Sequence, residues 1–246
     1  MSRPKIEIRP DAESLAESLA DWIIARFEGS TGPFALNLSG GSTPKRLYQV
    51  LGSEIIRRKI DWERVHIFFG DERFVPADHA DSNYGMIHKA LITRVPIPEE
   101  NVHRVETETG TPAEAAAAYE RTLKGFYGKE TIDMSRPLFA VTLLGLGDDG
   151  HTASLFPGTD ALRERDKWVT AVVGAKPEPR ITMTFPVLAS SRDVVFLVAG
   201  EAKRGMLKRL IEQNPSIPAA NVESQGALHV FCDEAALGDP ALLAGK

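Results

Sequence analysis

The chain has 246 residues, of which 43% are hydrophobic and 26% are charged, and its formal net charge at pH 7 is −5. This composition is ordinary for a globular protein, and the length allows one large α/β domain or two smaller ones. The acidic balance, without any basic run, argues against a general nucleic-acid-binding face. An anionic ligand would therefore need a local basic pocket.

Cysteine content and hydropathy bear on the compartment. The single cysteine, Cys232, excludes an intrachain disulfide and a cysteine-based metal site. Because it lies in an apolar segment, we interpret it as a packed core thiol and not as a nucleophile. Residues 1–17 lack the apolar core of a signal peptide, and no segment approaches the roughly 20 apolar residues of a membrane span. We expect a cytoplasmic protein that does not bind membranes.

Strand-like and helix-like segments alternate along the chain. Strands are expected at residues 6–8, 34–38, 65–69, 138–144, 168–173, 180–184, 194–199 and 228–232. Helices are expected at residues 12–28, 44–51, 83–92, 112–127 and 201–211, with a short one after Asp233. This alternation predicts an α/β protein with an open, mostly parallel sheet that carries helices on both faces. We expect residues 1–246 to form a single domain.

The loop after the strand Phe34–Leu38 has the composition of an anion site. It reads Ser-Gly-Gly-Ser-Thr-Pro at 39–44, and we expect Thr43 to cap the following helix and Pro44 to be its first residue. Free N–H groups, the positive end of the helix dipole and hydroxyl groups would converge there on an anion. The alternative is an ordinary capped turn, and this motif alone does not decide between the two.

The segment Leu138–Thr159 is the most informative. Its apolar start, Leu138–Leu144, predicts a strand buried on both faces, which leads into GLGDDGH at 145–151. The spacing GxGxxG also occurs in dinucleotide-binding loops. We reject that function because Pro157 and Gly158 leave no room for a long helix, and the segment about 20 residues further on contains no acidic residue.

Four predicted strands run into polar or glycine-rich turns: SGGST after Leu38, GDER after Phe69, GLGDDGH after Leu144 and GEAK after Ala199. Each turn taken alone could be an ordinary structural feature without a function. GDER, for example, would be a solvated, salt-bridged corner. However, ligands of parallel α/β sheets bind beyond the carboxyl ends of the strands. We therefore expect one cationic site with hydroxyl donors and one histidine base, which suits a small phosphorylated, polyhydroxylated molecule.

These stretches resemble the 6-phosphogluconolactonase family from Phe34 to the C-terminal strand. The matching motifs are LSGGSTP at 38–44, FFGDERFVP at 68–76, DSNYG at 81–85, LLGLGDDGHTASLFPGT at 143–159, RITMTFPVL at 180–188 and VVFLVAGEAKRGML at 194–207. The motif at 143–159 is very specific, whereas LSGGSTP is shared with sister families. The resemblance implies a Rossmann-like fold of the sugar-phosphate isomerase and lactonase type.

The same resemblance implies hydrolysis of 6-phosphoglucono-1,5-lactone in the oxidative pentose phosphate pathway, with no metal and no cofactor. His151 would be the general base that takes a proton from water and returns it to the ring oxygen. Asp149 would orient the imidazole or bind a sugar hydroxyl, and Arg73 would stabilise the oxyanion or bind phosphate. The remaining phosphate-binding candidates are Gly40, Gly41, Ser42, Thr43, Arg180 and Lys203, the last of these in the first turn of a helix.

Three alternatives carry less weight. A serine nucleophile is set aside because Ser39 and Ser154 lack the GxSxG elbow. The sister family of glucosamine-6-phosphate deaminases has a glutamate shortly after the histidine, where this chain has Leu155-Phe156. A sugar-phosphate sensor would keep the phosphate loop but usually carries a DNA-binding helix-turn-helix, for which no segment is left. The other five histidines are interpreted as structural or surface residues.

Overall fold

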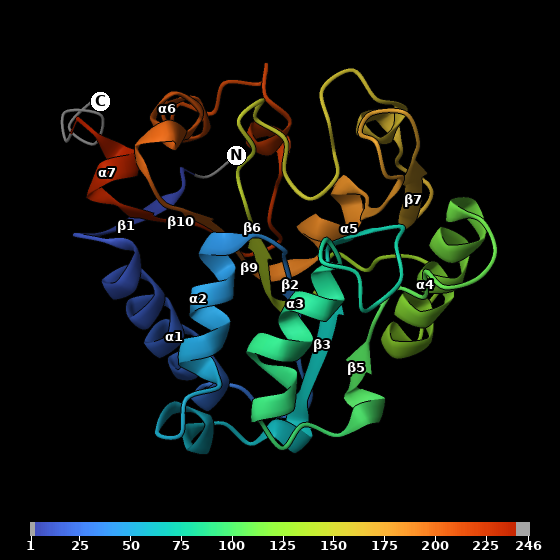
Figure 1. Cartoon of the computed structure of the whole chain (residues 1–246), viewed down its shortest axis with the longest axis horizontal. Helices are drawn as coiled ribbons and strands as arrows, with labels where there is room; N and C mark the ends of the chain where they lie inside the picture. The colour runs from blue at the N-terminus through green and yellow to red at the C-terminus, as the bar shows by residue number, and fades with distance from the viewer. Residues whose placement is uncertain (1–2, 240–246) are drawn as a thin grey trace.

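The computed structural model describes residues 3–239, and its core is a seven-stranded sheet flanked by helices (Figure 1). All neighbouring strands are parallel. Their order across the sheet is β1 (Lys5–Arg9), β10 (Ala227–Asp233), β9 (Ser191–Val198), β6 (Phe139–Leu144), β2 (Phe34–Leu38), β3 (Val65–Phe69) and β5 (Val102–His103). The predicted open, mostly parallel sheet is therefore confirmed.

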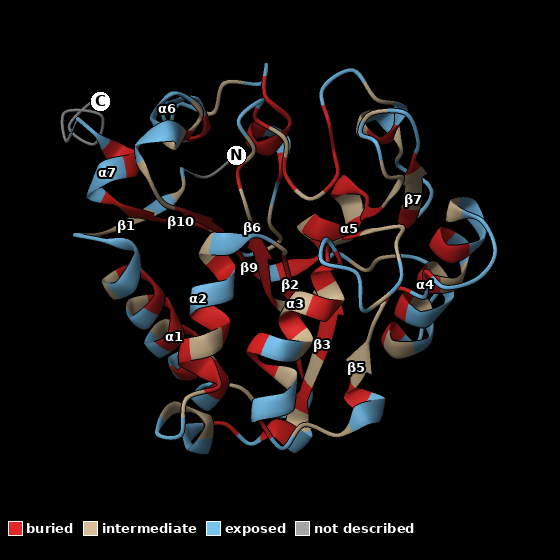
Figure 2. Cartoon of the chain, viewed as in Figure 1, coloured by how far each residue is buried: buried red, intermediate tan, exposed pale blue. Residues whose placement is uncertain are grey.

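Helices cover both faces of this sheet, as the sequence predicted. One face packs against α1 (Ala12–Glu28), α2 (Ser42–Leu51) and α3 (Asn83–Ala90). The other face packs against α4 (Pro112–Tyr127), α5 (Phe185–Ala189), α6 (Arg204–Ile211) and α7 (Glu234–Leu237). Figure 2 shows the central strands buried and the helices exposed only on their outer sides. Each fully buried Val, Leu or Phe contributes about 1.5–3 kcal/mol through removal from water.

Local capping explains why several helices begin and end where the sequence indicated. The Asp11 carboxylate accepts the Ser14 N–H at 2.8 Å, and the Ser82 hydroxyl accepts the Gly85 N–H at 3.0 Å. Helix α4 ends at Gly128, whose φ of 74° lies in the left-handed region that glycine adopts readily. Cys232 is buried in β10, and burial raises its pKa to about 11, in agreement with a packed thiol.

The segment GDER, expected as a polar turn after Phe69, contains a short strand. Residues Asp71–Arg73 form the strand β4, which pairs antiparallel with β8 (Arg180–Met183), and β8 in turn pairs with β7 (Val169–Val172). These three strands make a second, separate sheet. A three-residue strand of charged side chains shows no alternation in hydrophobicity, and its partner lies far along the chain, so no local pattern reveals the pairing.

Two helix starts also differ from the prediction. Helix α2 begins at Ser42 after the N-cap Gly41, so Thr43 lies inside the first turn and does not cap it. The expected helix from Glu201 begins instead with a 3-10 turn, Glu201–Lys203, and the α-helix α6 starts only at Arg204. Lys203 therefore precedes α6 and is not in its first turn.

The chain changes direction across the sheet between β2 and β6. From β2 it continues outward to β3 and β5, whereas from β6 it continues to β9 and β10 on the other side. The connections after these two neighbouring strands diverge and leave a crevice at their carboxyl ends, which is the usual place for a ligand in such sheets. Among residues 3–239, no helix has the length and hydrophobicity needed to cross a membrane.

The buried carboxylate of Asp193, at the opposite end of the sheet, allows a test of the fold. It accepts Arg26 Nε at 3.0 Å and pairs with His229 Nε2 at 2.8 Å. Burial raises its pKa, but His229 and Arg26 outweigh this, so the net pKa is lowered. We expect Asp193→Asn to reduce the free energy of unfolding by about 2 kcal/mol. The melting temperature should fall by about 4–8 °C.

The pH dependence of that variant follows from the lowered pKa of Asp193. A carboxyl whose pKa is lower in the folded state stabilises the fold above its unfolded pKa and loses this contribution as the pH falls through its folded pKa. The difference in melting temperature between wild type and Asp193→Asn should therefore shrink in acid. Thermal denaturation at several pH values measures it, and a constant difference would contradict the assigned ion pair.

Candidate active site

A pocket of about 380 Å³ opens at the carboxyl ends of β2 and β6. It is lined by residues from the loops after β2, β6 and β9, and by β4 and β8 of the small sheet. Of the nine residues predicted from the sequence, eight line it: Gly40, Gly41, Ser42, Thr43, Arg73, His151, Arg180 and Lys203. The ninth, Asp149, lies behind His151 and contacts it.

The loop after β2 presents its backbone to this pocket. Gly41, the N-cap of α2, has a φ of 114°, and no side chain caps the helix. The first N–H groups of α2 therefore keep their capacity to bind an anion. The base of the loop is anchored by Tyr48, whose hydroxyl donates to Ser39 O at 2.7 Å and accepts Ser39 N–H at 3.1 Å.

A tight loop after β6 holds His151 at the pocket wall. The Gly150 N–H donates to Gly147 O at 3.0 Å, and the Gly147 N–H donates to His151 O at 2.8 Å. A Cβ on Gly147 would lie 2.0 Å from His151 Nδ1, so only glycine leaves room for the ring. Phe156 also packs against the imidazole, with 4.7 Å between ring centroids. The loop thereby limits where the ring can point.

Asp149 is in direct contact with this imidazole. Its Oδ1 accepts the His151 backbone N–H at 3.0 Å and is hydrogen-bonded to His151 Nδ1. Partial burial raises the pKa of Asp149. The hydrogen bonds to His151 and the charges of His151 and Lys176 lower the pKa by more than burial raises it, so the net pKa is below its ordinary value. An ionised Asp149 favours the tautomer with the proton on Nδ1 and leaves Nε2 to accept a proton.

Two arginines face the pocket from the small sheet. Arg73 on β4 and Arg180 on β8 are direct cross-strand partners. Like charges in this position destabilise a sheet unless an anion lies between them or other groups compensate. The Arg73 guanidinium donates to Asp81 O, and Arg180 forms an ion pair with Glu178 at 3.4 Å. Arg73 and Arg180 together place two cationic side chains at this wall of a protein whose net charge is negative.

Lys203 brings a further cation from the loop after β9. Its ammonium forms an ion pair with the exposed Asp148, and this bond lowers the pKa of Asp148. The loop is tied to the end of β10, because the Asp233 carboxylate accepts the Gly200 N–H at 3.0 and 3.1 Å. The same carboxylate caps α7 through the Ala236 N–H, so two elements share one anchor.

Several further pocket residues received no binding or catalytic role in the sequence analysis, among them the polar residues Asp71, Asn83, Ser154 and Lys176. The Ser154 hydroxyl donates to Asp71 Oδ2 at 2.6 Å, and Asn83 Nδ2 donates to Asp71 O at 2.9 Å and to Oδ1 at 3.3 Å. Asp71 thus joins the histidine loop to the start of α3. Asp71, Asn83 and Ser154 lie inside the motifs that match the family, and that position in the sequence could have pointed to them as site residues. Lys176 lies outside every motif, so nothing in the sequence indicated its place in the pocket.

The other five histidines lie elsewhere. His66 Nδ1 on β3 is 3.2 Å from His103 Nε2 on the edge strand β5, and burial lowers the pKa of both rings. His229 pairs with Asp193, while His79 and His88 lie on a loop and on α3. Of the six histidines only His151 lines the pocket, which agrees with the structural or surface interpretation of the others.

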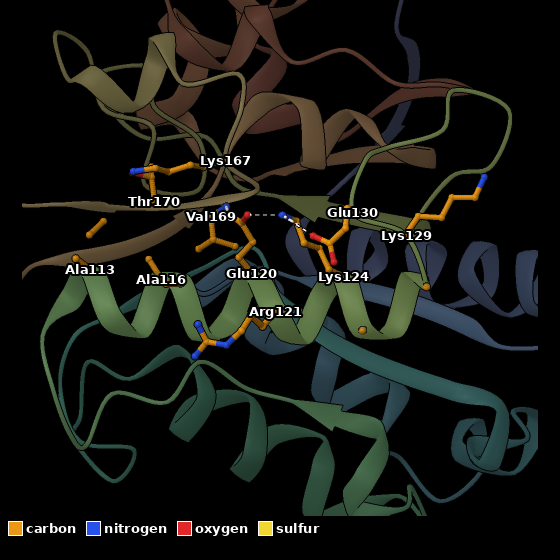
Figure 3. Close-up of a pocket in the computed structure, with 14 residues that line it drawn as sticks. Ala113, Ala116, Glu120, Arg121, Lys124, Lys129, Glu130, Lys167, Val169 and Thr170 are labelled. Atoms are coloured by element: carbon orange, nitrogen blue, oxygen red, sulfur yellow. Dashed lines mark hydrogen bonds and ion pairs between the residues drawn. The ribbon is translucent and has the colours of Figure 1, made fainter.

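A larger hollow of about 930 Å³ lies between α4 and β7 (Figure 3). Its central charges are already paired, because Lys124 binds Glu120 at 2.8 Å and Glu130 at 3.3 Å. Glu120 also accepts the Trp168 N–H at 2.8 Å. None of the nine predicted site residues lines this hollow. The smaller pocket at the carboxyl ends of β2 and β6 is therefore the candidate active site.

The chain matches the family model described as glucosamine-6-phosphate isomerases/6-phosphogluconolactonase over residues 10–230. It is 40% identical to a 6-phosphogluconolactonase of Nostoc sp., a match that covers 94% of this chain and 96% of the relative. It is 38% identical to a human 6-phosphogluconolactonase, a match that covers 94% of this chain and 92% of the human protein. The chain thus belongs to the glucosamine-6-phosphate isomerase/6-phosphogluconolactonase family.

Solved structures agree with this assignment. A 6-phosphogluconolactonase from Trypanosoma cruzi superposes with a TM-score of 0.84 at 31% identity, covering 98% of both chains. A 6-phosphogluconolactonase from Thermotoga maritima gives a TM-score of 0.80 at 28% identity, covering 94% of this chain and all of the other. A monomeric glucosamine-6-phosphate deaminase, at 18% identity and a TM-score of 0.79, shares the fold.

The anchoring role of Tyr48 is testable. Tyr48→Phe removes the hydroxyl and leaves the buried N–H and C=O of Ser39 without partners, which should cost about 1–3 kcal/mol of unfolding free energy in urea denaturation. Amide exchange at Ser39–Ser42 should become faster. Tyr84→Phe is the matched control, because no hydrogen bond of the Tyr84 hydroxyl is found among residues 3–239. Equal effects of both variants would contradict the anchor.

Proposed function

We propose that this protein is a 6-phosphogluconolactonase, which hydrolyses 6-phosphoglucono-1,5-lactone to 6-phosphogluconate in the oxidative pentose phosphate pathway. The observation that carries the proposal is the His151–Asp149 pair at the wall of a pocket that also contains Arg73, Arg180 and Lys203. A base beside several cations suits an ester of an anionic sugar. The relatives at 38–40% identity over nearly the whole chain support the same activity.

In the proposed mechanism, His151 Nε2 takes a proton from water, and the oxygen of that water attacks the carbonyl carbon of the lactone. Asp149 stabilises the imidazolium that forms, because its carboxylate accepts the hydrogen bond from Nδ1. The tetrahedral intermediate then collapses, the bond from the carbonyl carbon to the ring oxygen breaks, and His151 returns the proton to that oxygen. The reaction consumes one water and needs no cofactor.

Arg73 has two proposed roles, since its guanidinium can stabilise the oxyanion of the intermediate or bind the phosphate. Arg180, Lys203 and the N–H groups around Gly40–Thr43 are proposed to bind the phosphate. The cross-strand placement of Arg73 and Arg180 supports an anion at this wall, because a dianion between them would remove their repulsion. Lys176 also lines the pocket and adds a further positive charge to it.

Nothing at the site favours a deaminase. Leu155 is fully buried in the core and Phe156 packs on the imidazole, so neither position offers the acid–base group that the deaminase family has after its histidine. We also propose a single domain, because side chains of β6 and β8 share one hydrophobic cluster. A reducing, cytoplasmic location is proposed on the basis of the single, buried cysteine.

The proposed base gives the first test of this function. His151→Ala should lower kcat by about 10²- to 10⁴-fold, the usual contribution of a positioned base, while binding of 6-phosphogluconate stays largely intact. In the wild type, kcat/KM should fall in acid, because a protonated imidazole cannot accept a proton. A pH-stat assay with fresh lactone measures both. His88→Ala serves as the control, and activity of His151→Ala within a few-fold of wild type would exclude the base.

The proposed phosphate contacts give the second test. One charge-assisted hydrogen bond is worth about 1.5–3 kcal/mol, so Arg180→Ala or Lys203→Ala should lower kcat/KM for the phosphorylated lactone by about 10- to 150-fold. Residual turnover of unphosphorylated gluconolactone should change much less. Lys208→Ala, which removes an exposed cation outside the pocket, is the control. Equal losses on both substrates would show that the residue serves chemistry or folding instead.

A further inference from the structure

Glu72 is an almost fully buried carboxylate whose hydrogen bonds hold two segments together. Its Oε1 accepts the N–H groups of Arg73 at 2.8 Å and Asn83 at 2.7 Å. Its Oε2 accepts the Tyr84 N–H at 2.7 Å and the Ser82 hydroxyl at 3.3 Å. Since Asn83 and Tyr84 are the first two residues of α3, the Glu72 side chain ties the strand β4 to the N-terminus of that helix.

The position of Glu72 on β4 keeps it away from the substrate. Successive side chains of a strand point to opposite faces, and the neighbours Asp71 and Arg73 both line the pocket. Glu72 does not line it, and its residue is only 2% exposed. Any influence of Glu72 on the reaction must therefore pass through the residues that it holds.

Asn83 is the residue through which this influence reaches the pocket. Its side chain donates to both the backbone and the carboxylate of Asp71. It also packs directly on the backbone of Gly40, because a Cβ on Gly40 would lie 1.8 Å from Asn83 Oδ1. One side chain thus touches both the glycine loop after β2 and the strand that carries Asp71 and Arg73.

We propose that Glu72 is a positioning residue of the lactonase site: its carboxylate fixes the start of α3, and the Asn83 side chain then holds Asp71 and the Gly40 loop in place. This inference rests on the proposed function for its activity assay. It assigns Glu72 no contact with the substrate. It accounts for a buried acidic residue in the middle of the GDER segment that the mechanism itself does not use.

The identity of the side chain supports this role. Burial raises the pKa of Glu72 to about 7, against the opposing effect of the Tyr84, Asn83 and Arg73 N–H groups. Keeping a carboxyl in such a place costs stability, which an apolar side chain would avoid. However, the ionised form, which predominates above that pKa, has two adjacent oxygens without protons and can accept all four donors together. Glutamine keeps the shape but replaces one acceptor by an NH₂ group, which opposes a backbone N–H.

The test combines activity with a double-mutant cycle, assayed well below the melting temperature of each variant. Glu72→Gln and Asn83→Ala should each lower kcat/KM for the phosphorylated lactone by about 10-fold or more, or 1.4 kcal/mol. If Glu72 acts through Asn83, the double variant should lie within about threefold of Asn83→Ala. Losses that multiply, or wild-type kcat/KM in Glu72→Gln, would overturn the inference.

The matched control is Asp193→Asn, which also removes a buried, hydrogen-bonded carboxylate but lies at the opposite end of the sheet. It should lower the melting temperature and leave kcat/KM within about threefold of wild type. A loss of kcat/KM as large as that of Glu72→Gln would mean that destabilisation alone explains both. Should Glu72→Gln not fold, Asn83→Asp replaces the donor to Asp71 by an acceptor. It should lower kcat/KM at least 10-fold, and a wild-type value would refute the proposed route.

Amide hydrogen exchange separates this inference from the proposed function. In Glu72→Gln, the amides of Asn83 and Tyr84 and those of Gly40 and Gly41 should exchange faster, whereas in Asp193→Asn they should keep wild-type rates. This readout needs no substrate. If wild type fails to hydrolyse the lactone, the proposed function is wrong, yet faster exchange in the Gly40 loop still supports the coupling. Unchanged exchange at Gly40 and Gly41 would refute it whatever the activity.

Discussion

The divergence of the chain after β2 and β6 is the constraint on which the rest of the site depends. Parallel strands require crossover connections, and the two neighbouring strands send theirs in opposite directions across the sheet. The crevice between these connections receives the glycine loop before α2 from one side and the loop with His151 from the other. Both loops start from strands that are almost entirely buried, so the sheet fixes the distance between the proposed anion-binding backbone and the proposed base.

Small residues and single polar anchors convert that crevice into a defined pocket. Gly147 leaves space for the imidazole and Gly40 for the Asn83 side chain, which lets segments from different parts of the chain touch. Tyr48 anchors the loop after β2 in the same way that Asp233 anchors the loop after β9. In each case a buried polar group satisfies backbone atoms that a loop would otherwise leave unpaired, so the loops stay ordered without being long or hydrophobic.

The small antiparallel sheet supplies two of the cations that line the pocket, which the proposed anionic ligand would need in an acidic protein. Strands β4 and β8 set Arg73 against Arg180, and Lys203 reaches the pocket from the segment after β9. Two of these cations are paired with carboxylates in this structure, Lys203 with Asp148 and Arg180 with Glu178, so an anionic ligand would have to compete with those carboxylates. Arg73 differs from these two, because its guanidinium donates to the backbone carbonyl of Asp81 and keeps its charge uncompensated by that contact.

From the sequence alone, the parallel sheet, most helix ends and the glycine loops followed, because these depend on hydrophobic periodicity, capping side chains and backbone freedom within a few residues. The eight predicted residues that line the pocket followed from the polar turns at the strand ends and from the resemblance to the lactonase family. The strand β4, the pairing of Arg73 with Arg180, and the roles of Glu72 and Asn83 did not follow. They depend on contacts between segments far apart in the chain, which no local pattern encodes. Only the tertiary structure decides which polar side chain finds which buried partner.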